Sequence, residues 1–234
     1  MSHYLPALDR RLALMQLSDS FFPSGSFTLS HGLESLIYSG QLKSPDDFQE
    51  FLRLLLSHKV GPSDLVALIH AYRASVADNL EEVRRADLQL FAQTLVQEAR
   101  EAQRKSGRAL LMVARSTWAD SQLESLSVYA ATGKIQCVHP VVFAVVGRAA
   151  CLTESDTVLA FLHSFLTNLC GAAIRLGVLG HLRSQLILKT IASEVEVVAN
   201  QAASMDLEHM WSCTPSIDIA QMSHQQLPQK LFTN

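Results

Sequence analysis

Cys137 and His139, two residues of types that can ligate metal ions, lie two positions apart in this chain. A further histidine, His31, lies in a serine-rich segment near the N-terminus. Thiolate and imidazole are ligands that suit Ni²⁺ and Zn²⁺. Two ligands at this spacing do not complete a site, and the other histidines are scattered. The alternative is a partly buried cysteine beside a surface or capping histidine, because cysteines are commonly buried. Cys137 and His139 are therefore weak metal candidates, and we expect no stably bound cofactor.

No complete set of residues for a familiar catalytic or nucleotide site occurs in the sequence. The segment 132–135, Thr-Gly-Lys-Ile, lacks the first glycine and the hydroxyl of a P-loop. Asp206 and His209 have the spacing of one ligand pair of a di-iron helical bundle, which needs two pairs. The sequence around Ser24 and Ser26 does not place a glycine on both sides of a serine, as a nucleophile elbow requires. We therefore expect no catalytic residues, and a small-molecule enzyme is the least favoured class.

Composition indicates a folded chain with protein partners. Of 234 residues, 48% are hydrophobic and 18% are charged, and 19 basic against 22 acidic residues give a net charge of −3. Dense clusters of Lys and Arg are missing, which argues against nucleic acid as a partner. The N-terminus has no basic region followed by an apolar run, and the four cysteines form no C-x-x-C pair. A reduced, cytoplasmic protein is the expected class.

Apolar residues recur at helical spacing along almost the whole chain, and strand-like alternation is nearly missing. This pattern predicts an all-α fold, with about ten helices in one domain over residues 1–215. A polar tail with apolar positions follows over residues 216–234, and we expect it to become ordered on a partner. The expected helices are 5–17, 29–38, 45–60, one capped by Ser63, 79–105, 108–118, 121–131, 140–150, 157–179 and 185–209. Gly61-Pro62 and Ser106-Gly107 are the expected helix ends.

The segment 157–179 is apolar enough to resemble a membrane span. His163, Asn168 and Arg175 interrupt it, however, and its small residues allow close packing. We therefore expect a buried central helix and no membrane span. A guanidinium in such a helix needs carboxylate or carbonyl partners or a place at an interface, so Arg175 is assigned to a buried ion pair or to an interface.

The segment 16–34 is expected to form a shaped loop between two helices. Pro23 fixes φ and removes a backbone donor, and Gly25 can adopt conformations closed to other residues. Loops of this kind often carry function, although turn formation alone would use the same residue types.

The loop resembles the N-terminal signature of the UreF family of urease accessory proteins. The matching positions are Ser18-Asp19-Ser20, Pro23, Gly25, Phe27, Ser30 and Gly32-Leu33-Glu34. Further resemblance follows in the family's order at residues 104–111, 139–143, 172–180, 215–224 and 231–232. Gln225 and Lys230 depart from the family's Glu and Arg, and Lys lacks the bidentate fork of Arg.

The resemblance implies a dimeric, non-catalytic helical protein that binds UreD (also called UreH). With UreD it would recruit and regulate the GTPase UreG, so that the complex delivers nickel to the urease apoprotein. Whether the GTPase is stimulated or restrained stays open. The residues assigned to UreG are Ser18, Asp19, Pro23, Gly25, Glu34 and Arg108. The residues assigned to UreD are Ile217, Met222, His224, Leu227, Leu231 and Phe232. A generic helical adaptor with unrelated partners is the alternative.

Overall fold

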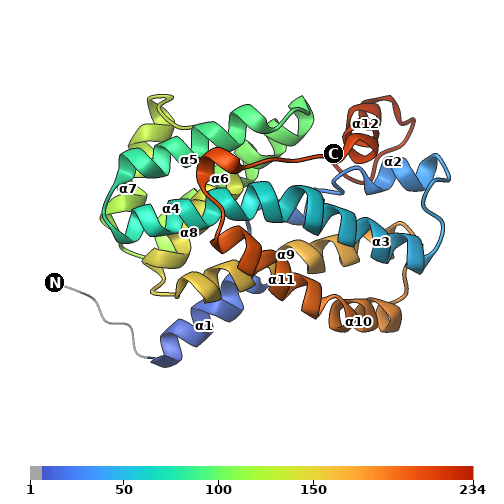
Figure 1. Cartoon of the computed structure of the whole chain (residues 1–234), viewed down its shortest axis with the longest axis horizontal. Coiled ribbons are helices and arrows are strands. Elements are labelled where there is room, and N and C mark those ends of the chain that lie inside the picture. The colour runs from blue at the N-terminus through green and yellow to red at the C-terminus, as the bar shows by residue number, and fades with distance from the viewer. Residues whose placement is uncertain (1–6, 234) are drawn as a thin grey trace.

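The computed structural model describes residues 7–233, and over these residues it contains helices and connecting turns but no strand (Figure 1). The all-α prediction is confirmed. The α-helices are α1 (Ala7–Ser18), α2 (Leu33–Tyr38), α3 (Pro45–Leu55), α4 (Val66–Val76), α5 (Leu80–Gln93), α6 (Gln97–Thr117), α7 (Ser121–Ala131), α8 (His139–Ala149), α9 (Glu154–Arg175), α10 (His181–Thr190), α11 (Ala192–Ala203) and α12 (Pro215–Ser223). Short 3-10 turns are η1 (Ser26–Thr28), η3 (Leu207–His209) and η4 (His224–Gln226).

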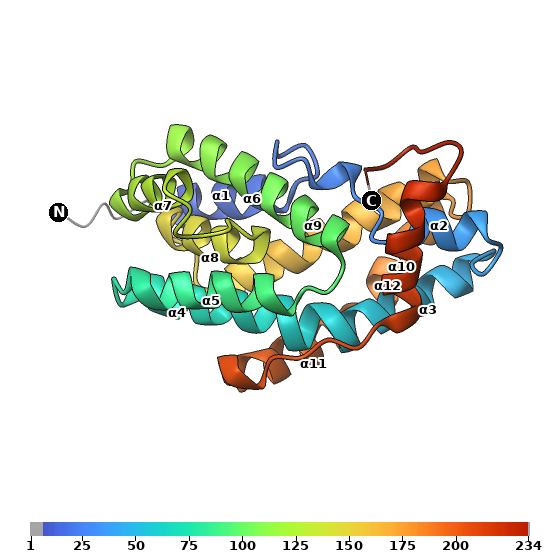
Figure 2. The same cartoon turned by 90° about the horizontal axis from the view of Figure 1, so that it is seen from above.

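The longest element is a continuous rod in which the π-helix η2 (Leu56–Leu65) joins α3 to α4, as Figure 2 shows in cyan. Its start agrees with the sequence, because the Ser44 hydroxyl accepts from the Asp47 amide in a capping box. The predicted break at Gly61-Pro62 is wrong. The wider π-helical turn carries the chain past the proline, and Gly61 lies so close to α11 that a Cβ there would overlap Val198.

Three other predicted boundaries are also wrong. The expected helix 79–105 is broken at residues 94–96, where Thr94 caps α5 with a bond from its hydroxyl to the Leu90 carbonyl. The helix α6 then runs on through Ser106-Gly107. Gly107 serves packing here, since a Cβ at this position would overlap the carbonyl of Cys137. The expected helix 185–209 is divided into α10, α11 and η3.

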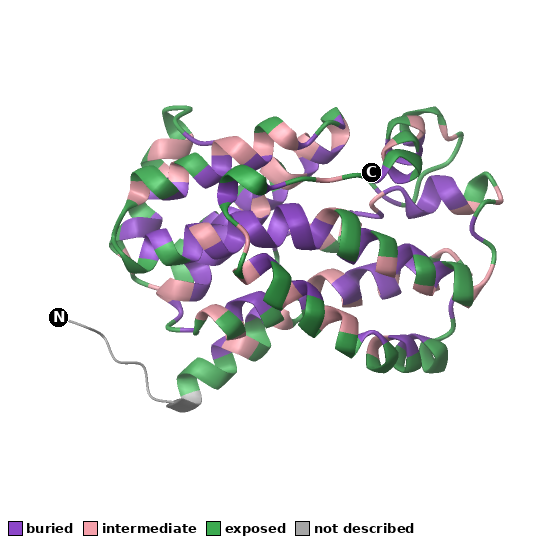
Figure 3. Ribbon diagram, viewed as in Figure 1, coloured by how far each residue is buried: buried purple, intermediate pink, exposed green. Residues whose placement is uncertain are grey.

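The core centres on α8, which packs on α4, α6 and α9, and buried residues are concentrated in α4, η2, α8 and α9 (Figure 3). The helix α9 is long and apolar enough by composition to cross a membrane, but 67% of its apolar window is buried inside the protein. It packs on α1, α8 and η1, as expected for a central helix of a folded domain. The charged faces of α10 and α11 lie outside this core.

The C-terminal tail is folded back onto the protein's own helices. The predicted boundary between 215 and 216 lies inside α12, which packs on α2 and α6. Ile217 is 4% exposed and Phe232 is 5% exposed. The tail therefore packs against the same folded unit as the signature loop.

Candidate functional site

The signature loop, residues 18–34, is held by short-range hydrogen bonds. The Ser18 hydroxyl donates to the Leu14 carbonyl at 2.7 Å and the Asp19 carboxylate accepts from the Phe21 amide at 2.9 Å. Gly25 precedes η1 with φ of 76°. Gly32 has φ of 86°, and a Cβ there would lie 3.1 Å from the Ile217 carbonyl oxygen. The glycine at 32 thus lets α12 approach the loop closely.

Glu34 joins the loop to the tail. Its side chain is buried, and Oε2 lies 2.7 Å from Nε2 of His224. The amide of Leu231 donates to Oε1 at 2.7 Å, and the amide of Phe232 donates to Oε2 at 3.3 Å. A buried carboxylate needs such donors, because burial without them is costly. Glu34 was expected on a surface that meets a GTPase, and it is instead an internal anchor for the tail.

Arg175 secures the same junction from α9. Its guanidinium donates to the Phe27 carbonyl at 2.7 Å and to the Gly171 carbonyl at 3.2 Å, and it lies 4.4 Å from the centre of the Phe232 ring. The residue is exposed, and its guanidinium contacts carbonyls and a ring, not a carboxylate. The buried ion pair expected as one alternative is therefore not what this structure contains.

The tail residues divide into two groups. Ile217, His224 and Phe232 are buried against this chain's own helices. Met222 is 50% exposed and Leu231 is 69% exposed, while Leu227 is intermediate. Only the second group offers side chains to a partner without rearrangement. Ile219, which was not assigned from the sequence, is 63% exposed and belongs with them.

The residues assigned to the GTPase are not brought together in one patch. Ser18 and Asp19 line a groove of about 520 Å³ between α1 and α9. Arg108 lines another of about 430 Å³ between α6 and α7. Gly25 lines a third, and Pro23 is exposed beside it. With Glu34 buried, the six positions are spread over several faces.

The groove beside Gly25 is the one built from the signature loop, α6 and the tail together. It has a volume of about 680 Å³. The loop contributes Ser24, Gly25 and Thr28, and the tail contributes Gln225 and Thr233. The α6 side is formed by Gln97, Glu98, Glu101, Ala102, Lys105, Ser106 and Ala109. Sequence inspection missed this face of α6, although Ala102, Ser106 and Ala109 follow the spacing of one helix face and could have indicated it.

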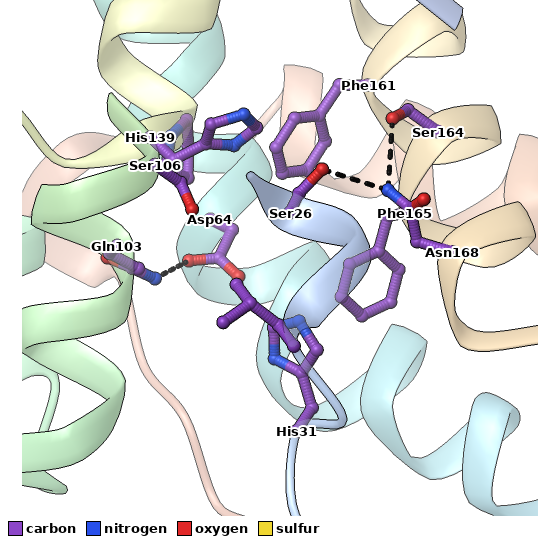
Figure 4. A pocket seen from close by; sticks show the side chains of 12 residues that line it. Ser26, His31, Asp64, Gln103, Ser106, His139, Phe161, Ser164, Phe165 and Asn168 are labelled. Atoms are coloured by element: carbon purple, nitrogen blue, oxygen red, sulfur yellow. Dashed lines mark hydrogen bonds between the residues drawn. The ribbon is translucent and has the colours of Figure 1, made fainter. Parts of the chain in front are cut away.

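A cavity of about 50 Å³, lined by polar and apolar side chains, lies beneath the loop between α6, α8, α9 and the rod (Figure 4). His31 from the loop, Asp64 from the π-helix and His139 from α8 all face it, and Gln103 donates to Asp64 at 3.2 Å. Asn168 donates to the Ser26 hydroxyl at 3.0 Å on the opposite wall.

Burial controls the charge of the groups around this cavity. Burial lowers the pKa of His31 to about 3, helped by the charges of Lys59 and His139, and lowers the pKa of His139 to about 4. Burial raises the pKa of Asp64 to about 6, although Lys59 and the Gln103 bond oppose the shift. The two imidazoles are therefore neutral at pH 7.

The metal candidates separate in the structure. His31 and His139 face the same cavity, but Cys137 is not among its lining residues. Burial and the charge of Asp87 raise the pKa of the Cys137 thiol to about 11, which keeps it protonated and a poor ligand. Within residues 7–233 no three His, Cys, Asp or Glu side chains are grouped to hold a metal ion.

Asp87 explains why the backbone turns sharply just before His139. Its carboxylate accepts from the amides of Gln136 at 2.5 Å and Val138 at 2.8 Å, while Cys137 between them has φ of 61°. Burial raises the pKa of Asp87 to about 6 against these bonds. Nothing in the local sequence identifies this role, because the partners are about 50 positions away.

The cavity carries Ser106, His139 and Asp64, which are the residue types of a hydrolytic triad. Asp64 accepts from the amide of Gln103 where a triad would require an imidazole. A volume of about 50 Å³ is also far below the roughly 300 Å³ of typical ligand pockets. The geometry favours a structural polar core over catalysis.

Comparison with known proteins places these features in a family. The family model UreF matches residues 42–192. The urease accessory protein UreF of Trichodesmium erythraeum is 55% identical over 227 residues, covering 97% of this chain and 98% of that protein. The protein of the same name from Geobacillus kaustophilus is 31% identical over 222 residues, covering 94% and 96%. That from Bradyrhizobium diazoefficiens is also 31% identical over 222 residues, covering 94% and 89%.

Proposed function

The chain belongs to the UreF family of urease accessory proteins, and from this premise we propose that it works in the maturation of urease. In this proposal it binds UreD (UreH) and recruits and regulates the GTPase UreG, so that the complex delivers nickel to the urease apoprotein in the cytoplasm. The protein itself is a homodimeric scaffold and not an enzyme, and nickel is handled by the assembled complex.

One observation carries the proposal beyond the family name. The signature loop and the C-terminal tail, which are separated by about 190 positions, form one continuous surface around Glu34. A groove of about 680 Å³ is lined by both segments together with α6. A scaffold that holds two proteins at once needs binding surfaces in a fixed relative position. The three hydrogen bonds of the buried Glu34 carboxylate to the tail fix the loop and the tail relative to one another.

The exposed apolar side chains of the tail support a UreD contact there. Ile219, Met222 and Leu231 are exposed, whereas their buried neighbours Ile217 and Phe232 hold the tail on the protein. Exposed apolar residues close together are characteristic of protein interfaces. The proposed UreD face therefore consists of Ile219, Met222, Leu227 and Leu231, and not of the full set expected from the sequence.

The groove supports a UreG contact. It carries charged side chains of both signs, Glu98, Glu101 and Lys105. These lie next to Gly25, whose backbone has the left-handed conformation. Charged rims of this kind set orientation and association rate more than affinity. The proposal replaces Glu34 and Arg108 by these α6 residues as the GTPase side.

The test is size-exclusion chromatography with light scattering on the protein co-expressed with UreD and UreG from the same source, with GDP or GTP present. We expect the protein to co-elute with UreD alone and with UreD and UreG together. Failure to form the complex with UreD, using well-folded components, would leave the generic helical adaptor as the better function.

A further inference from the structure

The middle of the central rod contains a proline that ordinary α-helix geometry would not accept. Pro62 lies inside the π-helix Leu56–Leu65, where it provides no amide proton. In an α-helix a proline ring collides with the carbonyl four residues earlier, which is that of His58. A π-helical turn is wider and pairs groups five residues apart, so it relieves this collision. Since Pro62 cannot donate, one carbonyl of the preceding turn lacks its usual donor.

The C-terminal segment supplies donors to these carbonyls from outside the helix. The amide of Cys213 donates to the His58 carbonyl at 2.8 Å, and the amide of Trp211 donates to the Pro62 carbonyl at 3.1 Å. The Trp211 ring also contacts the His58 ring edge-on, with centres 6.1 Å apart. Residues 211–213 thus lie along the rod, and the Cys213 amide bonds the carbonyl that the proline ring would meet in an α-helix.

Side chains attach α12, which follows residues 211–213, to the same π-helix. Lys59 of the π-helix lies 3.2 Å from the Asp218 carboxylate of α12 and 3.4 Å from the Gln221 side-chain oxygen. Both ion-pair side chains are largely buried, at 14% and 16% exposure. On another side of the helix Gly61 fits against Val198 without room for a Cβ.

The π-helix also carries Asp64 into the internal cavity. A change from π to α spacing changes the angle at which every side chain of this stretch leaves the helix axis. Asp64 and Lys59 would then point elsewhere. Asp64 lines the cavity together with His31, and the charge of Lys59 helps to lower the pKa of His31.

We propose that residues 211–213 are a backbone clasp that holds residues 56–65 in the π-helical form, so that the position of the C-terminal segment sets the geometry of the internal cavity. His58 is exposed, so water can replace the amide of Cys213 when the segment lifts. The clasp is therefore reversible, and Pro62 is the residue that makes the helix depend on it.

Hydrogen exchange measured by mass spectrometry on the full chain tests the clasp through four variants. Cys213→Pro removes the donor, and Cys213→Ala keeps it as the matched control. We expect Cys213→Pro to accelerate exchange in peptides covering residues 56–65 by roughly tenfold relative to Cys213→Ala, the effect of about one net hydrogen bond. In a Pro62→Ala background the helix can use its own amide for the His58 carbonyl, so the same substitution should change exchange by less than about threefold. An equal acceleration in both backgrounds, or none in either, would overturn the proposal.

The coupling to the cavity has its own readout. The imidazole resonances of His31 and His139 should shift in Cys213→Pro and stay near their original positions in the Pro62→Ala, Cys213→Pro double variant. Unchanged resonances in Cys213→Pro would limit the clasp to a local role and overturn the coupling. If Cys213→Pro does not fold, scalar coupling between the Cys213 nitrogen and the His58 carbonyl carbon can be measured in the unsubstituted protein. Its detection would support the bond in solution, and its failure to appear with full labelling would refute it.

Discussion

The carboxylate of Glu34 and the imidazole of His224 lie 2.7 Å apart in the interior, although 190 positions separate the two residues. The same carboxylate accepts from two amides of the C-terminal segment. The signature loop and the tail are thereby a single structural unit, and variants at Glu34 report on folding before they report on any partner.

Replacement of Glu34 should therefore destabilise the isolated protein. Glu34→Ala leaves three donors unpaired in a buried place, and we expect the free energy of unfolding to fall by about 3 kcal/mol. Urea denaturation measures this, with the exposed Glu50→Ala as control, which should change stability by less than about 0.5 kcal/mol. A double-mutant cycle with His224→Gln should show coupling of about 1 kcal/mol or more. Additive effects would mean that the pair does not interact in solution.

Exposed tail residues should affect the partner complex and not the fold. We expect Met222→Ser combined with Leu231→Ser to weaken binding of UreD by at least about tenfold, with stability changed by less than about 0.5 kcal/mol. Biolayer interferometry with immobilised UreD measures the affinity. Leu182→Ser on α10, where the side chain is 90% exposed, is the matched control for loss of surface leucine. Undiminished binding by the double variant would remove the tail from the UreD interface.

A charge reversal in the shared groove should act on the GTPase. Lys105 lines the groove and is exposed, so Lys105→Glu should leave the fold and UreD binding intact while UreG no longer co-elutes. Lys189→Glu, at an exposed position on α10, applies the same charge change elsewhere. If both variants recruit UreG equally well, the groove is not the UreG surface.

Acid should unfold the protein partly through its buried imidazoles. The pKa of His139 is lowered to about 4, so between this value and the ordinary 6.5 the unfolded chain binds a proton that the folded chain does not. Stability therefore falls as pH falls below 6.5, by about 1.4 kcal/mol per unit for this residue. The lowered pKa of His31 makes stability fall with pH in the same direction. The raised pKa values of Asp64 and Asp87 act oppositely: the folded chain keeps these carboxyls protonated up to about pH 6, so their contribution to stability is lost as pH rises through about 6.

His139→Gln should reduce this acid sensitivity. Between pH 7.5 and pH 5, we expect the variant to lose about 2 kcal/mol less stability than the unsubstituted protein. Denaturant unfolding at both pH values measures the loss of stability. The substitution also removes ring contacts with Phe143 and Phe161, but this effect is the same at both pH values and cancels in the difference. The exposed His181→Gln should retain the original pH dependence. Parallel pH profiles for all three proteins would show that His139 is not held neutral.

Two helix glycines should respond in opposite ways to alanine. At Gly107 a Cβ would overlap the Cys137 carbonyl, so Gly107→Ala should destabilise by about 2 kcal/mol or more. At Gly171 no atom lies within 4 Å of the new Cβ, so Gly171→Ala should stabilise α9 by about 0.5 kcal/mol. Thermal unfolding distinguishes the two. A stabilising Gly107→Ala would contradict the close packing of α6 on the turn before α8.

Features that depend on neighbours within a few positions could be predicted from the sequence. The start of α3 and both bounds of α7 agree with the prediction, because caps and turns use bonds three or four residues long. The all-α class follows from apolar periodicity in the same way. The family could be identified in the same way, because its motifs are residues in a fixed order along the sequence.

The tertiary structure alone decided which motif residues are surface and which are interior. Glu34 and His224 each look like surface polar residues in their own segments, and only the meeting of loop and tail buries them together. Gly61-Pro62 has the local signature of a helix end, but the helix continues as a π-helix, and amides from residues 211 and 213 bond its Pro62 and His58 carbonyls. Burial and long-range hydrogen bonds depend on segments distant in sequence, so local propensity was overruled at these positions.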